Sequence, residues 1–212
     1  MKKQHNVSQK ECNRCGKCCI KGGPTLHKKD KDLVVSGFLH PRDLILFRCY
    51  ETAFDPSSGK LISLDTELIK IRGKNDVGEC KFYNKEEAGC TIYEKRPLEC
   101  VMLKCWDTSD IEKILLKDVL TRADLIPKNS VLWRIIEEYE RTFNLILIRS
   151  TLESLKNRAE QHNFLKDLFK KDFAFRKTLE RDMEIQLDDQ KFFLGRPLAE
   201  IFNSDLLKNK NE

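Results

Sequence analysis

The sequence of 212 residues has no long hydrophobic run, and residues 1–11 are mostly polar and charged. A transmembrane helix needs about 20 mostly apolar residues, and a secretory signal needs a shorter apolar core behind a basic start. The sequence therefore predicts neither a membrane span nor a secretory signal. We expect a cytoplasmic protein of prokaryotic type that does not act at a membrane.

Recognisable catalytic motifs are also absent. The sequence has no GxGxxG loop for a nucleotide-like cofactor, no recognisable nucleophile paired with a base, and no carboxylate dyad or phosphate loop. No catalytic residue is predicted, and the sequence disfavours an enzyme.

The second half lacks cysteine and nearly lacks glycine. All nine cysteines and eight of the nine glycines precede residue 106. Residues 1–109 hold 20 Lys and Arg against 15 Asp and Glu, whereas residues 110–212 hold 19 of each. We predict an α+β protein. A small irregular cysteine-rich metal-binding domain with short antiparallel strands, residues 1–108, packs against an all-helical region, residues 109–212.

Eight of the nine cysteines fall into two groups of four. The first is a CxxCxxCC cluster and the second follows about sixty residues later, so the predicted metal ligands are Cys12, Cys15, Cys18, Cys19, Cys80, Cys90, Cys100 and Cys105. Disulfides are the competing interpretation, but an odd number of cysteines and a reducing cytosol disfavour them. Cys49 lies outside both groups and is interpreted as a small buried apolar residue.

The spacing bears on which metal is bound. A CxxCxxC run with one distant cysteine is the ferredoxin-like way to hold a [4Fe-4S] cluster, which is therefore the favoured cofactor. Zinc remains the alternative, although the second group has nine, nine and four intervening residues rather than the paired CxxC steps of a zinc ribbon. Adjacent Cys18 and Cys19 favour two centres or a polynuclear one. His27 and Asp107 are possible further ligands, although single residues of this kind are more often structural.

Basic residues surround the first cluster: Lys10, Arg14, Lys17, Lys21, Lys28 and Lys29. Cations lower thiol pKa values and offset the charge of bound thiolates. The sequence argues against nucleic acid as a partner, because no aromatic residue interleaves these side chains. The expected partner is an unidentified protein or redox partner.

Turn residues and periodicity predict the elements of the first half. Residues 12–24 are an irregular loop, Pro41 opens a short helix running to Phe47, and Pro56–Gly59 is a turn. Short strands are predicted at 61–64 and 68–72, paired as a hairpin, and again at 79–83 and 90–93. A helix from Pro97 carries Cys100 and ends near Cys105.

Helical periodicity dominates the second half. Ser109 and Glu112 form a capping box for a helix reaching Arg122. Further helices are predicted from Ser130 to about Ile146, from Phe164 to Met183, and from Gly195 with Ile201 and Phe202 on its apolar face, before a Lys-Asn tail. The apolar stripes are interpreted as core.

The cysteine order, together with the segment Cys90-Thr91-Ile92-Tyr93-Glu94-Lys95-Arg96-Pro97, resembles the YkgJ-type cysteine-cluster family, the CxxCxxCC proteins. The similarity covers roughly residues 12–106, with Val101 where the family pattern usually has arginine. It implies a zinc- or iron-chelating domain that uses the eight matching cysteines. Two functions follow: an iron-sulfur protein with a redox or metal-handling role, or a structural zinc module whose helices bind a partner. One branch of the family resembles flagellin lysine methylases, so a methylase-like enzyme is a weaker third.

Overall fold

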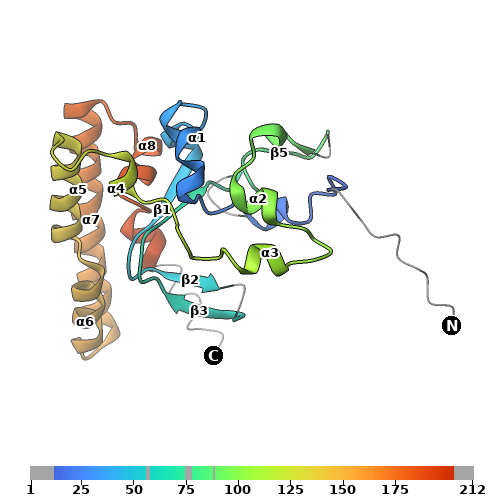
Figure 1. The fold of residues 1–212 in the computed structure, drawn as a ribbon. Helices are drawn as coiled ribbons and strands as arrows, with labels where there is room; N and C mark the ends of the chain where they lie inside the picture. The colour runs from blue at the N-terminus through green and yellow to red at the C-terminus, as the bar shows by residue number, and fades with distance from the viewer. Residues whose placement is uncertain (1–11, 56–57, 75–77, 88, 203–212) are drawn as a thin grey trace, which may run out of the picture.

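The computed structural model describes residues 12–55, 58–74, 78–87 and 89–202. Figure 1 shows three helices, α5, α6 and α7, on one side of the molecule, and β5, α2 and α3 on the other, with β1 between them. Short antiparallel strands precede a helical C-terminal part, so the predicted α+β class is confirmed.

The strands of the described residues form three two-stranded antiparallel sheets. Strand β1 (Leu44–Phe47) pairs with β4 (Leu68–Ile71), β2 (Thr52–Asp55) with β3 (Lys60–Ser63), and β5 (Tyr83–Asn84) with β6 (Gly89–Cys90). The predicted hairpin between 61–64 and 68–72 is therefore wrong in its pairing. Strands β1 and β4 are both mostly buried. They pair with each other although the hairpin of β2 and β3 lies between them in the sequence.

The predicted turn at Pro56–Gly59 falls partly outside the described residues, which omit Pro56 and Ser57. The predicted strands at 79–83 and 90–93 shorten to β5 and β6. Tyr93 instead begins a 3-10 turn, η5 (Tyr93–Lys95).

The helical segments of the first half are short. The predicted helix from Pro41 to Phe47 lasts one 3-10 turn, η3 (Pro41–Asp43), because Leu44 to Leu46 are buried in β1 instead. The helix carrying Cys100 is α2 (Leu98–Met102), which ends before Cys105. Among the described residues, the first half also contains η1 (Cys19–Lys21), η2 (Lys28–Asp30) and α1 (Lys31–Val35).

The predicted helix from Ser109 to Arg122 is wrong. Only α3 (Ser109–Glu112) and, later, α4 (Arg122–Leu125) are helical. Leu116 and Asp118 have positive φ angles of 59° and 48°, which end helical geometry for residues with a side chain. The chain between them and α4 pairs with the segment after Pro24, where the Leu120 amide donates to the Leu26 carbonyl at 2.9 Å. Tertiary pairing thus overrides the helical pattern.

The longer helices follow the prediction more closely. Ser130 caps α5 (Val131–Thr142) by accepting from the Trp133 amide at 3.1 Å. The predicted helix to Ile146 is divided in two: α5 ends at Thr142, and Ile146 belongs to a separate helix, α6 (Leu145–Ser154). Helix α7 (Arg158–Met183) begins six residues before the expected start at Phe164, and α8 (Leu187–Phe193) was not predicted. Residues 198–202 are helical as predicted, and the Lys-Asn tail lies outside the described residues.

The described residues form two large apolar cores and a small third cluster of Leu64, Leu68 and Val119. The helical core is built from α5, α6, α7 and the last helical residues, including Ile136, Tyr139, Phe143, Leu145, Ile148, Leu165, Leu179, Leu198 and Ile201. The N-terminal core surrounds β1 and β4 and includes Leu26, Leu39, Leu44, Leu46, Ile69, Ile71, Cys80, Tyr83, Leu120 and Phe192. Because Phe192 belongs to α8, which packs on β1, the C-terminal part closes the N-terminal core. The division at residues 108 and 109 stays a prediction.

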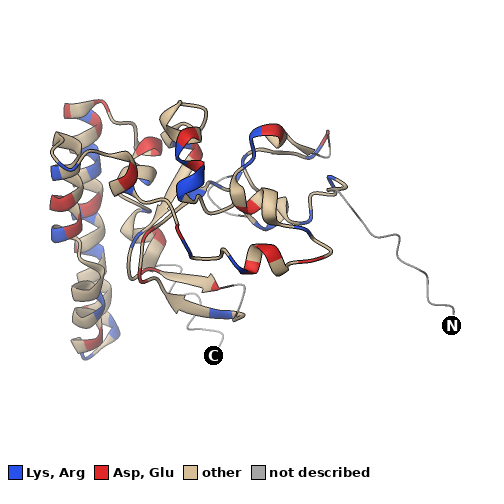
Figure 2. Cartoon of the chain, in the orientation of Figure 1, with Lys and Arg blue, Asp and Glu red and all other residues tan. Residues whose placement is uncertain are grey.

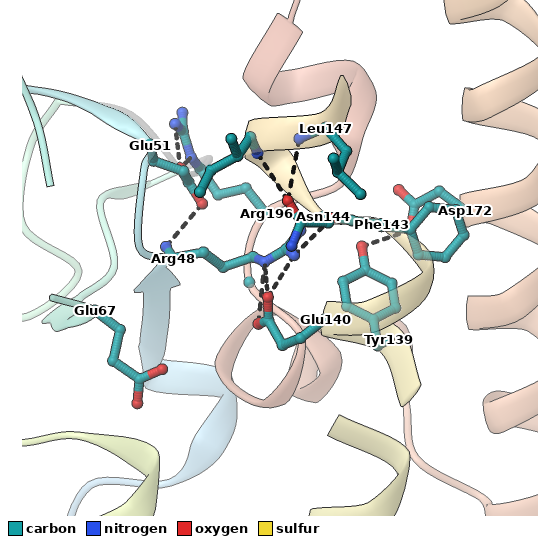
Figure 3. A network of polar contacts seen from close by, with 12 residues as sticks. Arg48, Glu51, Glu67, Tyr139, Glu140, Phe143, Asn144, Leu147, Asp172 and Arg196 are labelled. Carbon is teal, nitrogen blue, oxygen red and sulfur yellow. Dashed lines mark hydrogen bonds and ion pairs between the residues drawn. The ribbon is translucent and has the colours of Figure 1, made fainter. Parts of the chain in front are cut away.

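Buried arginines connect the same two parts (Figure 3). Arg48, which follows β1 and is 1% exposed, donates from Nε to Glu140 Oε2 at 2.9 Å and from Nη2 to the Phe143 carbonyl at 2.8 Å. Arg122 donates to Glu67 and Glu140, each at 2.7 Å. Figure 2 shows charges of both signs distributed over the helices. Within the described residues, no helix is long and apolar enough to cross a membrane.

Candidate metal centre

The first cysteine cluster lies on a loop that turns at Gly16. Gly16 has φ +73°, and its amide carbonyl accepts from the Ile20 amide at 2.9 Å. A Cβ atom at this position would lie 2.2 Å from the Tyr83 hydroxyl. The loop therefore lies directly on a buried side chain of β5, and Cys18 and Cys19 follow into the η1 turn at this contact.

Backbone hydrogen bonds bring the second group to the first. The Cys80 amide donates to the Cys19 carbonyl at 2.7 Å. The Tyr83 amide donates back to the Cys80 carbonyl at 2.9 Å, and Tyr83 is paired with Cys90 across the β5 and β6 hairpin. The hairpin thereby places Cys80 and Cys90 beside Cys19, although sixty residues lie between Cys19 and Cys80 in the sequence.

Cys100 reaches the same region from α2. Its thiol interacts electrostatically with those of Cys80, Cys90, Cys19 and Cys18. Five of the eight predicted ligands, from three segments of the chain, therefore lie within electrostatic range of one another. The Sγ atoms of Cys18 and Cys19 are 4.0 Å apart.

Burial and neighbouring thiols raise the pKa values of Cys19, Cys80 and Cys100. Burial, followed by the neighbouring Cys18, raises the pKa of Cys19 to about 12 from 9.0. Burial also raises the pKa of Cys80, and burial with the charges of Cys80 and Cys90 raises the pKa of Cys100. A bound cation reverses this balance, because a coordinating thiol loses its proton outright. Soft thiolate donors of this kind suit zinc or iron.

Three predicted ligands are more exposed than these five. Cys12, Cys15 and Cys105 are exposed. Among the described residues, no three His, Cys, Asp or Glu side chains are close enough to hold a metal ion between them. The assignment of all eight cysteines as ligands stays a prediction. Cys49 is partly buried beside Glu67, Glu140 and Arg122, and burial raises its pKa.

Neither of the two additional candidates faces the thiols through a described contact. His27 is 2% exposed, and its ring nitrogens face the Lys117 carbonyl at 2.8 Å and Glu99 Oε1 at 3.4 Å. Asp107 is exposed and accepts from the Ser109 amide at 3.0 Å at the start of α3, which lowers its pKa. Both side chains therefore have structural partners.

Arg14 and Arg96 both stack on Tyr93, a contact that sequence reasoning did not predict. The guanidinium carbons of Arg14 and Arg96 lie 4.6 Å and 3.9 Å from the centroid of the Tyr93 ring. Such cation-π contacts contribute about 0.5–1 kcal/mol at exposed sites. Arg14 lies between Cys12 and Cys15, so its contact holds the exposed end of the loop against the segment after Cys90. The feature of the sequence that could have indicated these two arginines is their position within the cysteine motifs.

The fold and the site define an α+β protein in which thiols from three segments of the chain share one region. A family model, CxxCxxCC, described as "Putative zinc- or iron-chelating domain", matches residues 11–117, just over half of the chain. The chain belongs to this family. No curated protein and no solved structure matches the chain.

Proposed function

We propose that the protein binds iron as an iron-sulfur cluster, with [4Fe-4S] as the favoured type, through the two cysteine groups, and that the bound centre serves a redox or metal-handling role. The observation that carries this proposal is that the thiols of Cys18, Cys19, Cys80, Cys90 and Cys100 share one region of the fold, within electrostatic range of one another. Four thiols suffice for a [4Fe-4S] cluster as they do for a tetrahedral zinc ion, so the preference for the cluster rests on the CxxCxxC spacing with a distant fourth cysteine.

The exposed cysteines fit this proposal through the coupling of metal binding to folding. Metal ligands commonly become ordered only when the ion binds. Cys12 and Cys15 lie on the loop that the stack of Arg14 on Tyr93 already holds near Cys90. We expect metal binding to protect both thiols from alkylation.

A structural zinc module is the second candidate, favoured by the position of Cys80 in the N-terminal core. Cys80 is 8% exposed, and its amide bonds to the Cys19 carbonyl, so an ion held by these thiols would stabilise the core directly. This function leaves the helical part free to hold a partner protein. Redox partner and interaction partner alike are proposals.

The first experiment is anaerobic purification followed by an absorption spectrum and by iron, sulfide and zinc analysis of one sample. Broad absorption near roughly 400 nm that bleaches with dithionite, with matching iron and acid-labile sulfide, supports the iron-sulfur centre. A colourless protein with stoichiometric zinc supports the structural module instead. Protein without any of these metals contradicts both.

The ligand assignment is tested by paired cysteine variants. Cys100→Ser is expected to reduce the metal content markedly, because serine does not replace a soft thiolate. Cys49→Ser is the matched control, since Cys49 is also partly buried but interacts with Glu67 and Glu140 rather than with the other thiols. Its metal stoichiometry should equal that of the unmodified protein. Equal metal loss in both variants would reject the assignment.

A further inference from the structure

Two buried carboxylates hold the first turn of α2. Asp30 accepts the Leu98 amide at Oδ1 and the His27 amide at Oδ2, both at 2.8 Å. Glu99 accepts the Thr25 amide at Oε2 at 2.7 Å, and its Oε1 faces His27 Nε2 at 3.4 Å. Asp30 is 5% and Glu99 is 9% exposed. The segment 25–30 and α2 are thus tied by contacts from which water is largely excluded.

The surroundings of His27 indicate that its ring is a cation. Its Nδ1 lies 2.8 Å from the Lys117 carbonyl, which can only accept a hydrogen bond, and its Nε2 faces the Glu99 carboxylate. A neutral imidazole has one N–H and satisfies one acceptor, whereas imidazolium donates to both. The imidazolium also balances the buried charge of Glu99.

Helix α2 depends on these contacts for its position. It has five residues, and Pro97 at its N-cap has no side-chain oxygen to accept a hydrogen bond. A single helical turn is unstable on its own, because the conformational entropy lost in forming it exceeds the stabilisation from its few hydrogen bonds. Glu99 and Cys100 are adjacent, about 100° apart around the helix axis, so fixing Glu99 on one side fixes the direction of Cys100 on another.

We propose that Glu99, paired with His27, is a positioning residue for the metal centre: it anchors α2 so that the Cys100 thiol meets those of Cys18, Cys19, Cys80 and Cys90. The inference rests on the proposed metal binding by the thiols. Glu99 itself is not a ligand, since both of its oxygens have partners in the segment 25–30.

The test is the variant Glu99→Gln in the full chain, because glutamine keeps the shape and removes the charge. Zinc affinity is measured anaerobically by competition with a chromophoric chelator. Cobalt(II) is then bound to the same samples, and the sulfur-to-cobalt charge-transfer intensity per bound ion reports how many thiolates coordinate. We expect Glu99→Gln to bind zinc about 10–100-fold more weakly, as loss of supporting contacts around metal ligands commonly does, and to show weaker charge transfer per cobalt.

Asp172→Asn is the matched control. Asp172 is 2% exposed and accepts the Leu198 amide at 2.8 Å, the same kind of contact that Asp30 makes with Leu98, but in the helical core. Its loss should lower the free energy of unfolding without changing zinc affinity or charge transfer in the folded protein. Equal weakening in both variants would show that stability alone governs binding and would overturn the positioning role.

The outcomes separate the two proposals. If the unmodified protein takes up neither iron, zinc nor cobalt, the proposed function fails. If it binds and Glu99→Gln binds equally well, the positioning role fails alone. Should Glu99→Gln not fold, His27→Gln is measured in its place, since it removes the cation and leaves Glu99 intact. A folded His27→Gln with unchanged zinc affinity and charge transfer would likewise overturn the inference.

Discussion

Two features of its surroundings require glycine at position 16. Its φ of +73° is left-handed, and an added Cβ would lie 2.2 Å from the hydroxyl oxygen and 2.4 Å from Cζ of Tyr83. Gly16→Ala should lower the free energy of unfolding by about 2–4 kcal/mol, from backbone strain together with overpacking against a buried ring. Urea unfolding in reductant measures this change.

Gly37→Ala is the matched control for that substitution. Gly37 has a similar φ of +76°, but no described atom lies within 4 Å of the added Cβ. Gly37→Ala should lower the free energy of unfolding by about 1 kcal/mol, from backbone strain alone. Equal costs in the two variants would mean that the contact with Tyr83 does not constrain the cysteine loop.

His27 should make stability depend on pH. The Glu99 carboxylate, followed by the Lys117 carbonyl and Asp30, raises the pKa of His27 above its ordinary value of 6.5, against the opposing effect of burial. A raised pKa in the folded state means that the stabilisation is fully present below the unfolded pKa and is lost as pH rises through the folded pKa. Unfolding free energy measured across this range should fall with rising pH.

The variant His27→Gln isolates this contribution from thiol titration. The difference in unfolding free energy between the unmodified protein and His27→Gln should be largest at low pH and shrink as pH rises. A difference that is constant with pH would contradict a protonated His27 in the folded protein.

At the residue scale, the sequence predicted which side chains are candidate metal ligands, but it did not predict which residues surround them. Cysteine spacing alone singled out the thiols, five of which converge in the structure. The spacing could not indicate that Gly16 lies against Tyr83 or that His27 pairs with Glu99, because those contacts join residues more than 60 positions apart. Short-range patterns contain no information about such pairs.

At the scale of elements, the break between α5 and α6 depends on Asn144. Its side-chain oxygen accepts from the amides of Ile146 and Leu147 at 3.0 and 3.1 Å (Figure 3). The break also releases the Phe143 carbonyl to accept from Arg48. Asn144→Ala should lower the free energy of unfolding by about 1 kcal/mol, the usual cost of losing an N-cap.

Asn163→Ala is the comparison, because Asn163 is exposed within α7 and alanine is the better helix former. It should be neutral or stabilising by a few tenths of a kcal/mol. Equal destabilisation by both alanines, measured by thermal and urea unfolding, would contradict a capping role for Asn144.

Helical elements were predicted well where local patterns decide and poorly where strand pairing or tertiary contacts decide. The helix start near Ser130 and the apolar stripe of α5 are local features, and the structure confirms both. The pairing of β1 with β4 and the loss of helix after Glu112 depend on what is buried and on pairing with residues near Leu26. Tertiary context overrides propensity at those sites.

At the scale of the whole molecule, the cysteine-rich part and the helices are joined by buried ion pairs as well as by apolar packing. Glu140 on α5 accepts from Arg48 and Arg122, whose side chains are 1% and 6% exposed. Glu140→Ala leaves the Arg48 charge without its carboxylate partner, so it should cost about 3 kcal/mol or more. Glu138→Ala, two residues away, removes an exposed pair with Arg141 and should cost less than about 1 kcal/mol.

The same pair of variants shows whether the two parts unfold together. The sequence contains two tryptophans, and Trp133→Phe leaves Trp106 as a fluorescent reporter beside Cys105, while far-UV circular dichroism reports the helices. Because Phe192 enters the N-terminal core and Glu140 binds arginines from the first part and from α4, both signals should change at one urea concentration. Glu140→Ala should shift both midpoints downward equally. If Glu140→Ala shifts the midpoint of the helical signal alone, the cysteine-rich part is an independent folding unit. The chain would then consist of two domains, divided at residues 108 and 109, that unfold separately.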